Sequence, residues 1–282
     1  MKTLLWQLVR TLPQPVKRYL FFIKAHRQIP RLRHPLSFNE KVNWRILHDR
    51  RPEIAWTCDK LEMKRFAATN CSAVKVPATL WFGDDVKKLA GFVFPDRWIL
   101  KANHRSHCVF IGNGQPSLEQ LEMVTASWME ETEGKTLGEW AYTQARPLIV
   151  LEEWIGDGAL APTDYKFYVF DGVVSMILAT EGRFGNERTV LYDRDWNRLP
   201  ASKGPSAYLG ELAKPAHLTE MIEIAENLAA SFDFMRIDLF DTDTGIYFGE
   251  TTPYPGGGMS PFQPRSFDRA LGDLWSLPTK HN

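Results

Sequence analysis

The pattern in residues 234–250 constrains the fold most, because it places charged side chains on one face of a β-hairpin. In the first strand, apolar residues point to one side: Met235, Ile237 and Leu239. Arg236 and Asp238 point to the other side, because side chains alternate along a strand. The following residues, 241–245, contain Asp, Thr and Gly, which favour a turn. A second strand then returns toward Glu250.

The predicted hairpin brings two carboxylates together. If Phe240 faces Ile246, Glu250 lies opposite Arg236 and diagonal to Asp238. Two buried carboxylates on one sheet face repel each other unless a cation neutralises them. Mg²⁺ is the natural cation for an all-oxygen pair, and substrate phosphates usually complete its coordination. The alternative is a hairpin whose charges are simply solvated.

Composition limits the class of protein. The chain has 282 residues, 44% of them hydrophobic, which suffices for one large domain or two modest ones. Lys+Arg and Asp+Glu both number 34, and no motif indicates a nucleic-acid partner. Three cysteines without CxxC spacing argue against a zinc site or a disulfide framework and favour a reducing cytoplasm. No apolar run has the roughly 20 residues of a membrane span, and no signal peptide is recognisable.

The first 36 residues form a basic amphipathic segment. Eight Lys or Arg residues and no Asp or Glu precede Glu40, so the remainder of this net-neutral chain carries −8. Bulky apolar residues lie between these cations, a composition that suits a helix at an anionic membrane surface through residues 1–33. The alternative is a helix that packs its apolar side on the protein and exposes a solvated basic face.

The remaining pattern predicts an α+β fold with mostly antiparallel strands in the second half. A capping box at Ser37 and Glu40 predicts a helix at Phe38–His48. Further helices are predicted at 59–68, 117–130 and 218–230, with a last helix ending near 277. Strands are predicted at 74–80, 98–102 and 148–151, with a hairpin at 164–170 and 173–179. Residues 103–115 and 253–264 are predicted loops, and 191–196 a turn.

Several charged residues are weak signals when taken singly. Lys101 ends a strand before a polar loop, as in many phosphate sites, but lysines at strand ends are commonplace. Asp164 and Lys166 share a strand face and could equally be an exposed edge-strand ion pair, worth about 0–1 kcal/mol. Lys60, with Lys64 and Arg65 one turn later, fits a surface helix. No Ser/His/Asp or Cys/His arrangement accompanies the histidines of the loop, His104 and His107.

In order along the chain, the motifs resemble those of ATP-grasp carboxylate–amine ligases. The likeness is to the TupA-like branch, which is linked with teichuronopeptide and other surface-polysaccharide synthesis. It runs from about Pro35 and rests on a set of short motifs: SFNEK at 37–41, CDK at 58–60, LKANH at 100–104, residues 147–155, DYK at 164–166, RID at 236–238, FGE at 248–250 and the loop at 255–262. The resemblance implies two α+β subdomains that clasp ATP, at 86–150 and 151–282, after an α/β region at 37–85.

The resemblance also implies roles for individual residues. Lys60 and Lys101 would contact ATP phosphates. Glu152 and the backbone of Glu153, Trp154 and Ile155 would hold the adenine. Asp164 would bind the ribose, and Lys166 would reach the phosphates as a catalytic cation. Asp238 and Glu250 would hold Mg²⁺, with Thr252 at a third metal position. Arg236 would steady the carboxylate substrate and the tetrahedral intermediate, and glycines 256–258 would let backbone amides approach that substrate.

This chain departs from the family pattern at two places. Arg105 and His107 stand in the phosphate-covering loop where glycine is expected, so the loop is expected to close differently, with Arg105 supplying charge. Thr252 stands where many members have asparagine, and its single hydroxyl is a weaker ligand.

The implied function is an ATP- and Mg²⁺-dependent ligase that joins a uronic or amino acid carboxylate to an amine through an acyl phosphate. The alternatives are a phosphotransferase acting on a sugar hydroxyl, and a non-catalytic nucleotide-binding member of a polysaccharide assembly.

Overall fold

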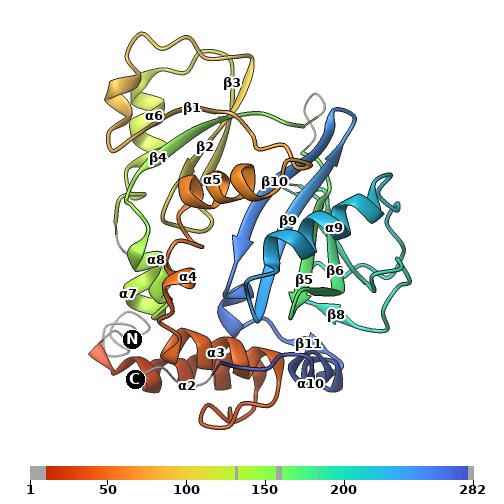
Figure 1. The fold of residues 1–282 in the computed structure, drawn as a ribbon. Coiled ribbons are helices and arrows are strands. Elements are labelled where there is room, and N and C mark those ends of the chain that lie inside the picture. The colour runs from red at the N-terminus through yellow and green to blue at the C-terminus, as the bar shows by residue number, and fades with distance from the viewer. Residues whose placement is uncertain (1–10, 131–132, 157–160, 184, 279–282) are drawn as a thin grey trace.

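The computed structural model describes residues 11–130, 133–156, 161–183 and 185–278. Two β-sheets stand beside each other, and a group of helices lies along the base of the molecule (Figure 1). Neighbouring strands in both sheets are antiparallel. The combination of helices with antiparallel sheets confirms the α+β class predicted from sequence.

The first sheet has four strands in the order β1-β4-β2-β3. They are β1 (Thr79–Gly83), β2 (Arg97–Ala102), β3 (Val109–Asn113) and β4 (Ile149–Glu153). Alternate side chains of β2 are buried, and they pack in a core shared with the 3-10 helix η1 (Val86–Leu89) and with α6 (Leu118–Thr125). The opposite face of this sheet is therefore available to the cleft described below.

The second sheet has five strands in the order β10-β9-β5-β6-β7. They are β5 (Asp164–Phe170), β6 (Val173–Glu181), β7 (Arg188–Tyr192), β9 (Phe234–Thr242) and β10 (Gly245–Thr252). Helix α9 (Leu218–Ala229) covers one face of this sheet (Figure 1). Its residues Met221, Ala225 and Leu228 follow helical spacing and are fully buried, so this helix anchors the larger core.

Helices surround these sheets. Those at the base are α2 (Gln14–His26), α3 (Phe38–His48) and α10 (Arg265–Asp273), and α5 (Lys60–Asn70) lies between the two sheets (Figure 1). The short elements are α4 (Pro52–Ala55), α7 (Glu133–Leu137), α8 (Trp140–Gln144), the 3-10 helix η2 (Pro255–Gly258) and the strand pair β8 (Ser202–Lys203) with β11 (Phe262–Gln263). Among the described residues, no helix combines the length and apolar character needed to cross a bilayer.

Local signals in the sequence located many elements correctly. The helix at Phe38–His48 has the predicted bounds, and Ser37 and Glu40 form the expected capping box. The strand at 98–102 and the hairpin at 164–179 are present, with the second hairpin strand two residues longer. The helix predicted at 117–130 is shorter, because α6 ends at Thr125.

Three predicted elements were wrong. The strand predicted at 74–80 begins only at Thr79, because residue 75 instead makes an isolated bridge to Tyr247. The predicted loop at 103–115 contains strand β3, which pairs along all of its length with β2. The predicted turn at 191–196 starts within β7, since the buried residues Leu191 and Tyr192 pair with β6.

Candidate active site

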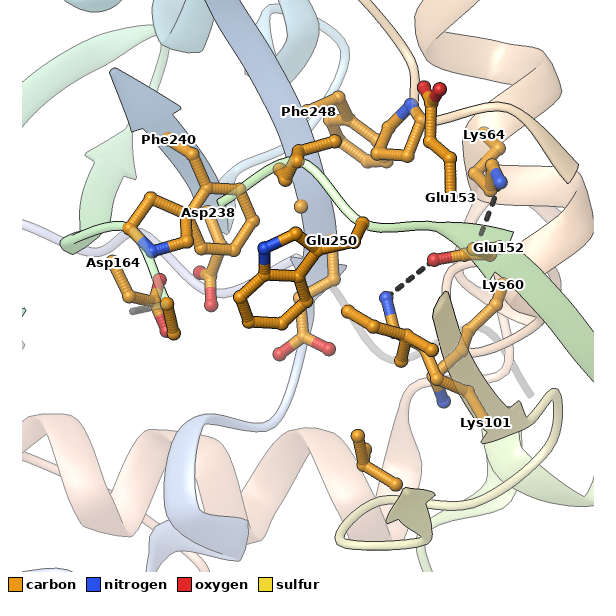
Figure 2. A pocket seen from close by; sticks show the side chains of 18 of the residues that line it. Lys60, Lys64, Lys101, Glu152, Glu153, Asp164, Asp238, Phe240, Phe248 and Glu250 are labelled. Carbon is orange, nitrogen blue, oxygen red and sulfur yellow. Dashed lines mark hydrogen bonds and ion pairs between the residues drawn. The ribbon is translucent and has the colours of Figure 1, made fainter. Parts of the chain in front are cut away.

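A cleft of about 930 Å³ lies where the two sheets approach each other. Figure 2 shows that its charged side chains come from both sides: Lys60, Lys64, Lys101 and Glu152 from α5, β2 and β4, and Asp164, Asp238 and Glu250 from β5, β9 and β10. Glu153, Trp154 and Ile155 also line it. The cleft and its contacts therefore bring together the residues given nucleotide, metal or catalytic roles from the sequence, but glycines 256–258 are not among the residues that line it.

Glu152 is the centre of one charge cluster. Its side chain is 3% exposed and meets two lysines, with Lys64 Nζ 2.9 Å from Oε1 and Lys101 Nζ 2.6 Å from Oε2. Burial opposes its ionisation, but the two lysines prevail and lower the pKa of Glu152 to about 2. Both carboxylate oxygens thus have cationic partners, and the cluster retains one surplus positive charge.

Lys64 is a site residue that the sequence analysis assigned to the surface. It is buried, and its ammonium also donates to the hydroxyl of Thr79 at 2.7 Å. The signal that could have identified it is its position four residues after Lys60, which places both lysines on one face of α5. Arg65, by contrast, is exposed and pairs with Glu62.

Lys60 stands at the start of α5, where Asp59 caps the helix by accepting from the backbone N–H groups of Leu61 and Glu62. Its ammonium donates to the carbonyl of Arg105 at 2.7 Å. Burial lowers the pKa of Lys60, whereas the charges of Glu250 and Glu152 oppose that change. Lys60 therefore interacts electrostatically with carboxylates on both sides of the cleft.

The loop after β2 carries the two departures from the glycine-rich pattern. His107 has φ of 60°, the left-handed conformation that glycine adopts most easily. A non-glycine residue in that region costs about 1 kcal/mol. The guanidinium of Arg105 donates to the carbonyl of Ser127 at 2.5 Å, outside the residues that line the cleft. His107 thus adopts the left-handed backbone conformation that a glycine would adopt more easily.

Asp164 and Lys166 lie on β5, beside β9. Cross-strand pairing sets Lys166 opposite Asp238, and Lys166 Nζ lies 3.5 Å from Asp238 Oδ2. Asp164 accepts through Oδ2 from Lys166 and, at 2.6 Å, from Arg183. Burial disfavours the charged carboxylate, but these cations lower the pKa of Asp164. Its other oxygen, Oδ1, has no hydrogen-bond partner among the described residues and remains an available acceptor.

Arg236 joins the two carboxylates of the hairpin. Its Nε donates to Asp238 Oδ1 at 2.6 Å and one terminal nitrogen donates to Asp238 Oδ2 at 2.7 Å. The same nitrogen donates to Glu250 Oε1 at 2.7 Å, and Thr252 Oγ1 donates to that oxygen at 3.1 Å. One guanidinium therefore serves two carboxylates.

These two carboxylates differ in their proton affinity. Burial raises the pKa of Asp238 to about 6, although Arg236 and Lys166 act in the opposite direction. The pKa of Glu250 falls to about 2, because Arg236 and Lys60 outweigh the effect of burial. Burial thus outweighs the two cations beside Asp238.

The hairpin register predicted from sequence was wrong, and the structure shows why the carboxylates still meet. Phe240 pairs with Tyr247 instead of Ile246, and Glu250 pairs with Asp238 instead of Arg236. A β-bulge falls between Phe248 and Glu250. Without that extra residue, Glu250 would pair with Ile237. Its side chain would then lie on the opposite face of the sheet from Asp238, because a slip of one residue reverses the face of every side chain.

Gly249 makes the bulge feasible. A Cβ atom at this position would lie 2.9 Å from the carbonyl oxygen of Asp238 and 3.0 Å from the ring of Phe240. Neither contact is sterically acceptable without movement, so the close approach of the two strands depends on glycine.

The donor set of the hairpin fits a hard divalent cation. Asp238, Glu250 and Thr252 present only oxygen atoms, the ligands that Mg²⁺ prefers, and burial keeps the pKa of Asp238 raised despite its cationic neighbours. Within the described ranges, no group of three or more His, Cys, Asp or Glu side chains forms a complete metal cage. A cation held here would therefore need further ligands from phosphate or water.

The rest of the cleft offers apolar walls. Trp154 packs its ring against Arg97, whose guanidinium carbon lies 4.8 Å from the ring centroid. Its indole N–H is buried and has no hydrogen-bond partner in the described part of the chain. Other apolar lining residues are Ile99, Val109, Ile155, Phe240 and Phe248. A flat aromatic ring can be enclosed between such walls, next to the lysines.

Comparison with solved structures finds distant likenesses. D-alanine–D-alanine ligase from Bacillus anthracis aligns at 17% identity over 78% of this chain and 64% of that chain, with a TM-score of 0.46. The macrocyclase MdnC from Microcystis aeruginosa MRC, bound with its precursor peptide MdnA, aligns at 11% over 80% and 62%, with a TM-score of 0.42. The ATP-grasp ligase PsnB, complexed with a minimal precursor, aligns at 13% over 72% and 54%, with a TM-score of 0.38.

The chain spans about half the length of PsnB, and we draw no mechanistic detail from likenesses at this level. No match was found among curated proteins. The sequence profile of the TupA-like ATP-grasp family matches residues 40–276, which include all of the cleft residues described above. This chain belongs to the TupA-like ATP-grasp family.

Proposed function

We propose that this protein is an ATP- and Mg²⁺-dependent ligase that joins a carboxylate to an amine. The observation that carries the proposal is the opposition of two charge clusters across one cleft, lysines around Glu152 on one side and the pair Asp238–Glu250 on the other (Figure 2). The surplus positive charge around Glu152 suits phosphate oxygens, and the paired carboxylates of Asp238 and Glu250 suit the metal that accompanies them. Membership of the ATP-grasp family supports the same chemistry.

The nucleotide would lie along the cleft. Its adenine would occupy the apolar slot beside Trp154, with polar contacts from the backbone of residues 153–155. Because both oxygens of Glu152 already bind lysines, we propose that Glu152 acts on the adenine side mainly by fixing the backbone of β4. Asp164 would accept a ribose hydroxyl through Oδ1, which has no partner among the described residues. Lys60, Lys101 and Lys166 would neutralise phosphate oxygens.

Asp238, Glu250 and Thr252 would hold Mg²⁺, which supplies charge neutralisation at the phosphates when bound. Arg236 now binds the same carboxylates, so metal binding would compete with it for their oxygens. Released from Glu250, the guanidinium would be able to bind the carboxylate substrate in two-pronged geometry. Arg236 and Lys166 are therefore the catalytic residues of the proposal.

The reaction would proceed in two balanced steps. An oxygen of the substrate carboxylate attacks the γ-phosphorus of ATP, and the bond to the β–γ bridging oxygen breaks, which gives an acyl phosphate and ADP. The amine nitrogen then attacks the acyl carbon, loses a proton and expels phosphate. Positioning and charge neutralisation carry such transfers, so no nucleophile of the protein is needed.

We place this activity in surface-polysaccharide or glycoconjugate synthesis, with a uronic or amino acid as the acyl substrate and an amino acid or amino sugar as the amine. Residues 86–150 and 151–282 would form the two halves that close on ATP, and glycines 256–258 would border the acyl substrate. The protein would act in the cytoplasm, with residues 1–33 touching the inner face of the membrane. Cys58, Cys71 and Cys108 form no disulfide, which is compatible with a reducing compartment.

The test is release of ADP and phosphate by the purified protein in a screen of carboxylates and amines. The proposal expects release that requires ATP, Mg²⁺, a carboxylate and an amine together. A stable phosphorylated product formed without an amine would instead identify a phosphotransferase. Glu250→Gln should abolish release, whereas the control Glu122→Gln, which changes an exposed ion pair with Lys87, should not.

A further inference from the structure

Helix α2 buries Phe22 and exposes Lys24, as a surface helix usually does, but its first half shows the opposite pattern. Its cations Lys17 and Arg18 are 6% and 0% exposed. Its large apolar side chains Val16, Tyr19 and Leu20 are 43%, 37% and 44% exposed. The spacing of three and four residues sets these apolar side chains on one face of the helix. The packing alternative from the sequence, a buried apolar side with a solvated basic face, does not describe these residues, whereas a helix at a membrane surface stays a prediction.

Specific contacts hold the helix in this orientation. Arg18 Nε donates to Asn43 Oδ1 at 2.8 Å, and its guanidinium also donates to the carbonyls of Gly257 and Leu137. Further along the helix, His26 Nε2 lies 3.0 Å from the carbonyl oxygen of Gly258. A buried guanidinium that lost these acceptors would be strongly unfavourable. The helix therefore cannot rotate to hide its apolar face without breaking this set of bonds.

Positive charge surrounds the exposed apolar face. Arg27, Arg31 and Arg33 are exposed immediately after the helix, together with Ile29, which is 70% exposed. Tyr19, Arg31 and Arg33 also line a groove between α2 and the segment leading to α3. The first acidic residue, Glu40, is buried and accepts from backbone N–H groups of residues 31, 36 and 37. It is therefore not positioned to neutralise these arginines.

We propose that α2 and residues 27–33 dock on an anionic lipid bilayer. The apolar side chains would enter the boundary between headgroups and acyl chains, and the arginines would face anionic headgroups. Large exposed apolar side chains beside arginines that form no ion pair with any described residue match this surface in both respects. A second copy of the chain fits less well, because a two-fold contact through this face would set the arginines of one copy against those of the other.

The test is co-sedimentation of the full chain with vesicles of phosphatidylcholine alone or of phosphatidylcholine and phosphatidylglycerol in equal amounts. We expect binding to the anionic vesicles only, weakening as salt is raised. Tyr19→Ser/Leu20→Ser should weaken binding at least about tenfold, because two large apolar side chains are removed from the contact. Arg27→Gln/Arg31→Gln should weaken it as well and reduce its salt dependence.

The matched control is Met123→Ser/Leu209→Ser, which removes two apolar side chains that are 77% and 87% exposed elsewhere on the surface. It should bind as the unaltered chain does. Unchanged melting by circular dichroism shows that each variant is folded. Equal binding to both vesicle types, no binding at all, or full binding by Tyr19→Ser/Leu20→Ser overturns the proposal. A lipid-free dimer that the same variant dissociates, measured by light scattering, overturns it in favour of self-association.

Discussion

The two charge clusters of the cleft use the same chemical groups in opposite proportions. Around Glu152, one carboxylate serves two lysines. Around Arg236, one cation serves two carboxylates. The pKa of Glu152 falls to about 2, whereas that of Asp238 rises to about 6, in both cases against the opposing influence of burial or of nearby cations. At Glu152 two lysines outweigh burial, whereas at Asp238 burial outweighs the nearby cations.

This difference indicates a difference in role. The Glu152 cluster is internally complete and holds β2, β4 and α5 together, with one positive charge left for an anion. In the Asp238 cluster, burial opposes the charged carboxylate more strongly than Arg236 and Lys166 favour it. Because Glu152 is favoured in its charged form and Asp238 is not, substitutions at these two carboxylates are expected to have opposite effects on stability.

The largest expected effect is on catalysis. Asp238→Asn should lower the rate of ADP release at least about 10³-fold, or about 4 kcal/mol, because it removes a proposed metal ligand. Asp84→Asn, in an exposed ion pair with Lys88, is the control and should leave the rate unchanged. An unchanged rate of ADP release in Asp238→Asn would show that Asp238 is not a metal ligand of the active site.

Glu152→Gln should destabilise the protein by about 3 kcal/mol, because it leaves Lys64 and Lys101 together without a counter-charge. Urea unfolding measures this free energy. Adding Lys64→Met to the same chain should recover part of the loss, since one of the two uncompensated cations is then removed. A loss of less than about 0.5 kcal/mol in Glu152→Gln would show that the cluster is not a structural centre.

Gly249→Ala should lower the free energy of unfolding by about 1–3 kcal/mol, because the added methyl group lies 2.9 Å from the carbonyl oxygen of Asp238. The change forces the bulge to move and so displaces Glu250. Gly91→Ala provides a comparison for the metal response, because Gly91 has a φ of 80°, unlike Gly249, and no described atom lies within 4 Å of its added carbon. Thermal melting with and without Mg²⁺ separates the two, since only Gly249→Ala should lose its response to the metal.

The smallest effect has the opposite sign. The pKa of Asp238 is raised from 3.8 to about 6 in the folded protein. Its contribution to the free energy of unfolding is therefore fully present below pH 3.8 and is lost as pH rises through 6. Metal-free Asp238→Asn should therefore be more stable than the unaltered chain at about pH 8, by about 1 kcal/mol, and the difference should shrink on acidification. Glu152 behaves in the reverse way, because its stabilisation is present above pH 4.5 and is lost toward pH 2. Melting curves across pH that show Asp238→Asn less stable at pH 8 would contradict this.

The parts of this molecule that sequence predicted well depend on local signals. The capping box of Ser37 and Glu40 fixes a helix within a few residues, and the turn after Phe170 fixes a hairpin. The pairing of Asp238 with Glu250 depends on the bulge at Gly249, which no local pattern announced. Strand β3 was missed because its apolar run, residues 109–111, is short, and pairing with β2 is what stabilises it as a strand. Lys64 was missed because its partner, Glu152, lies 88 residues away in the chain.

The most direct measurement is calorimetric titration with a non-hydrolysable ATP analogue, with and without Mg²⁺, on the unaltered chain, Lys101→Met and Asp238→Asn. We predict tight binding that Mg²⁺ strengthens in the unaltered chain, weak binding under both conditions in Lys101→Met, and binding without any Mg²⁺ effect in Asp238→Asn. Absence of nucleotide binding, or an equal Mg²⁺ effect in Asp238→Asn, would contradict the assignment of phosphate and metal to the two opposing clusters.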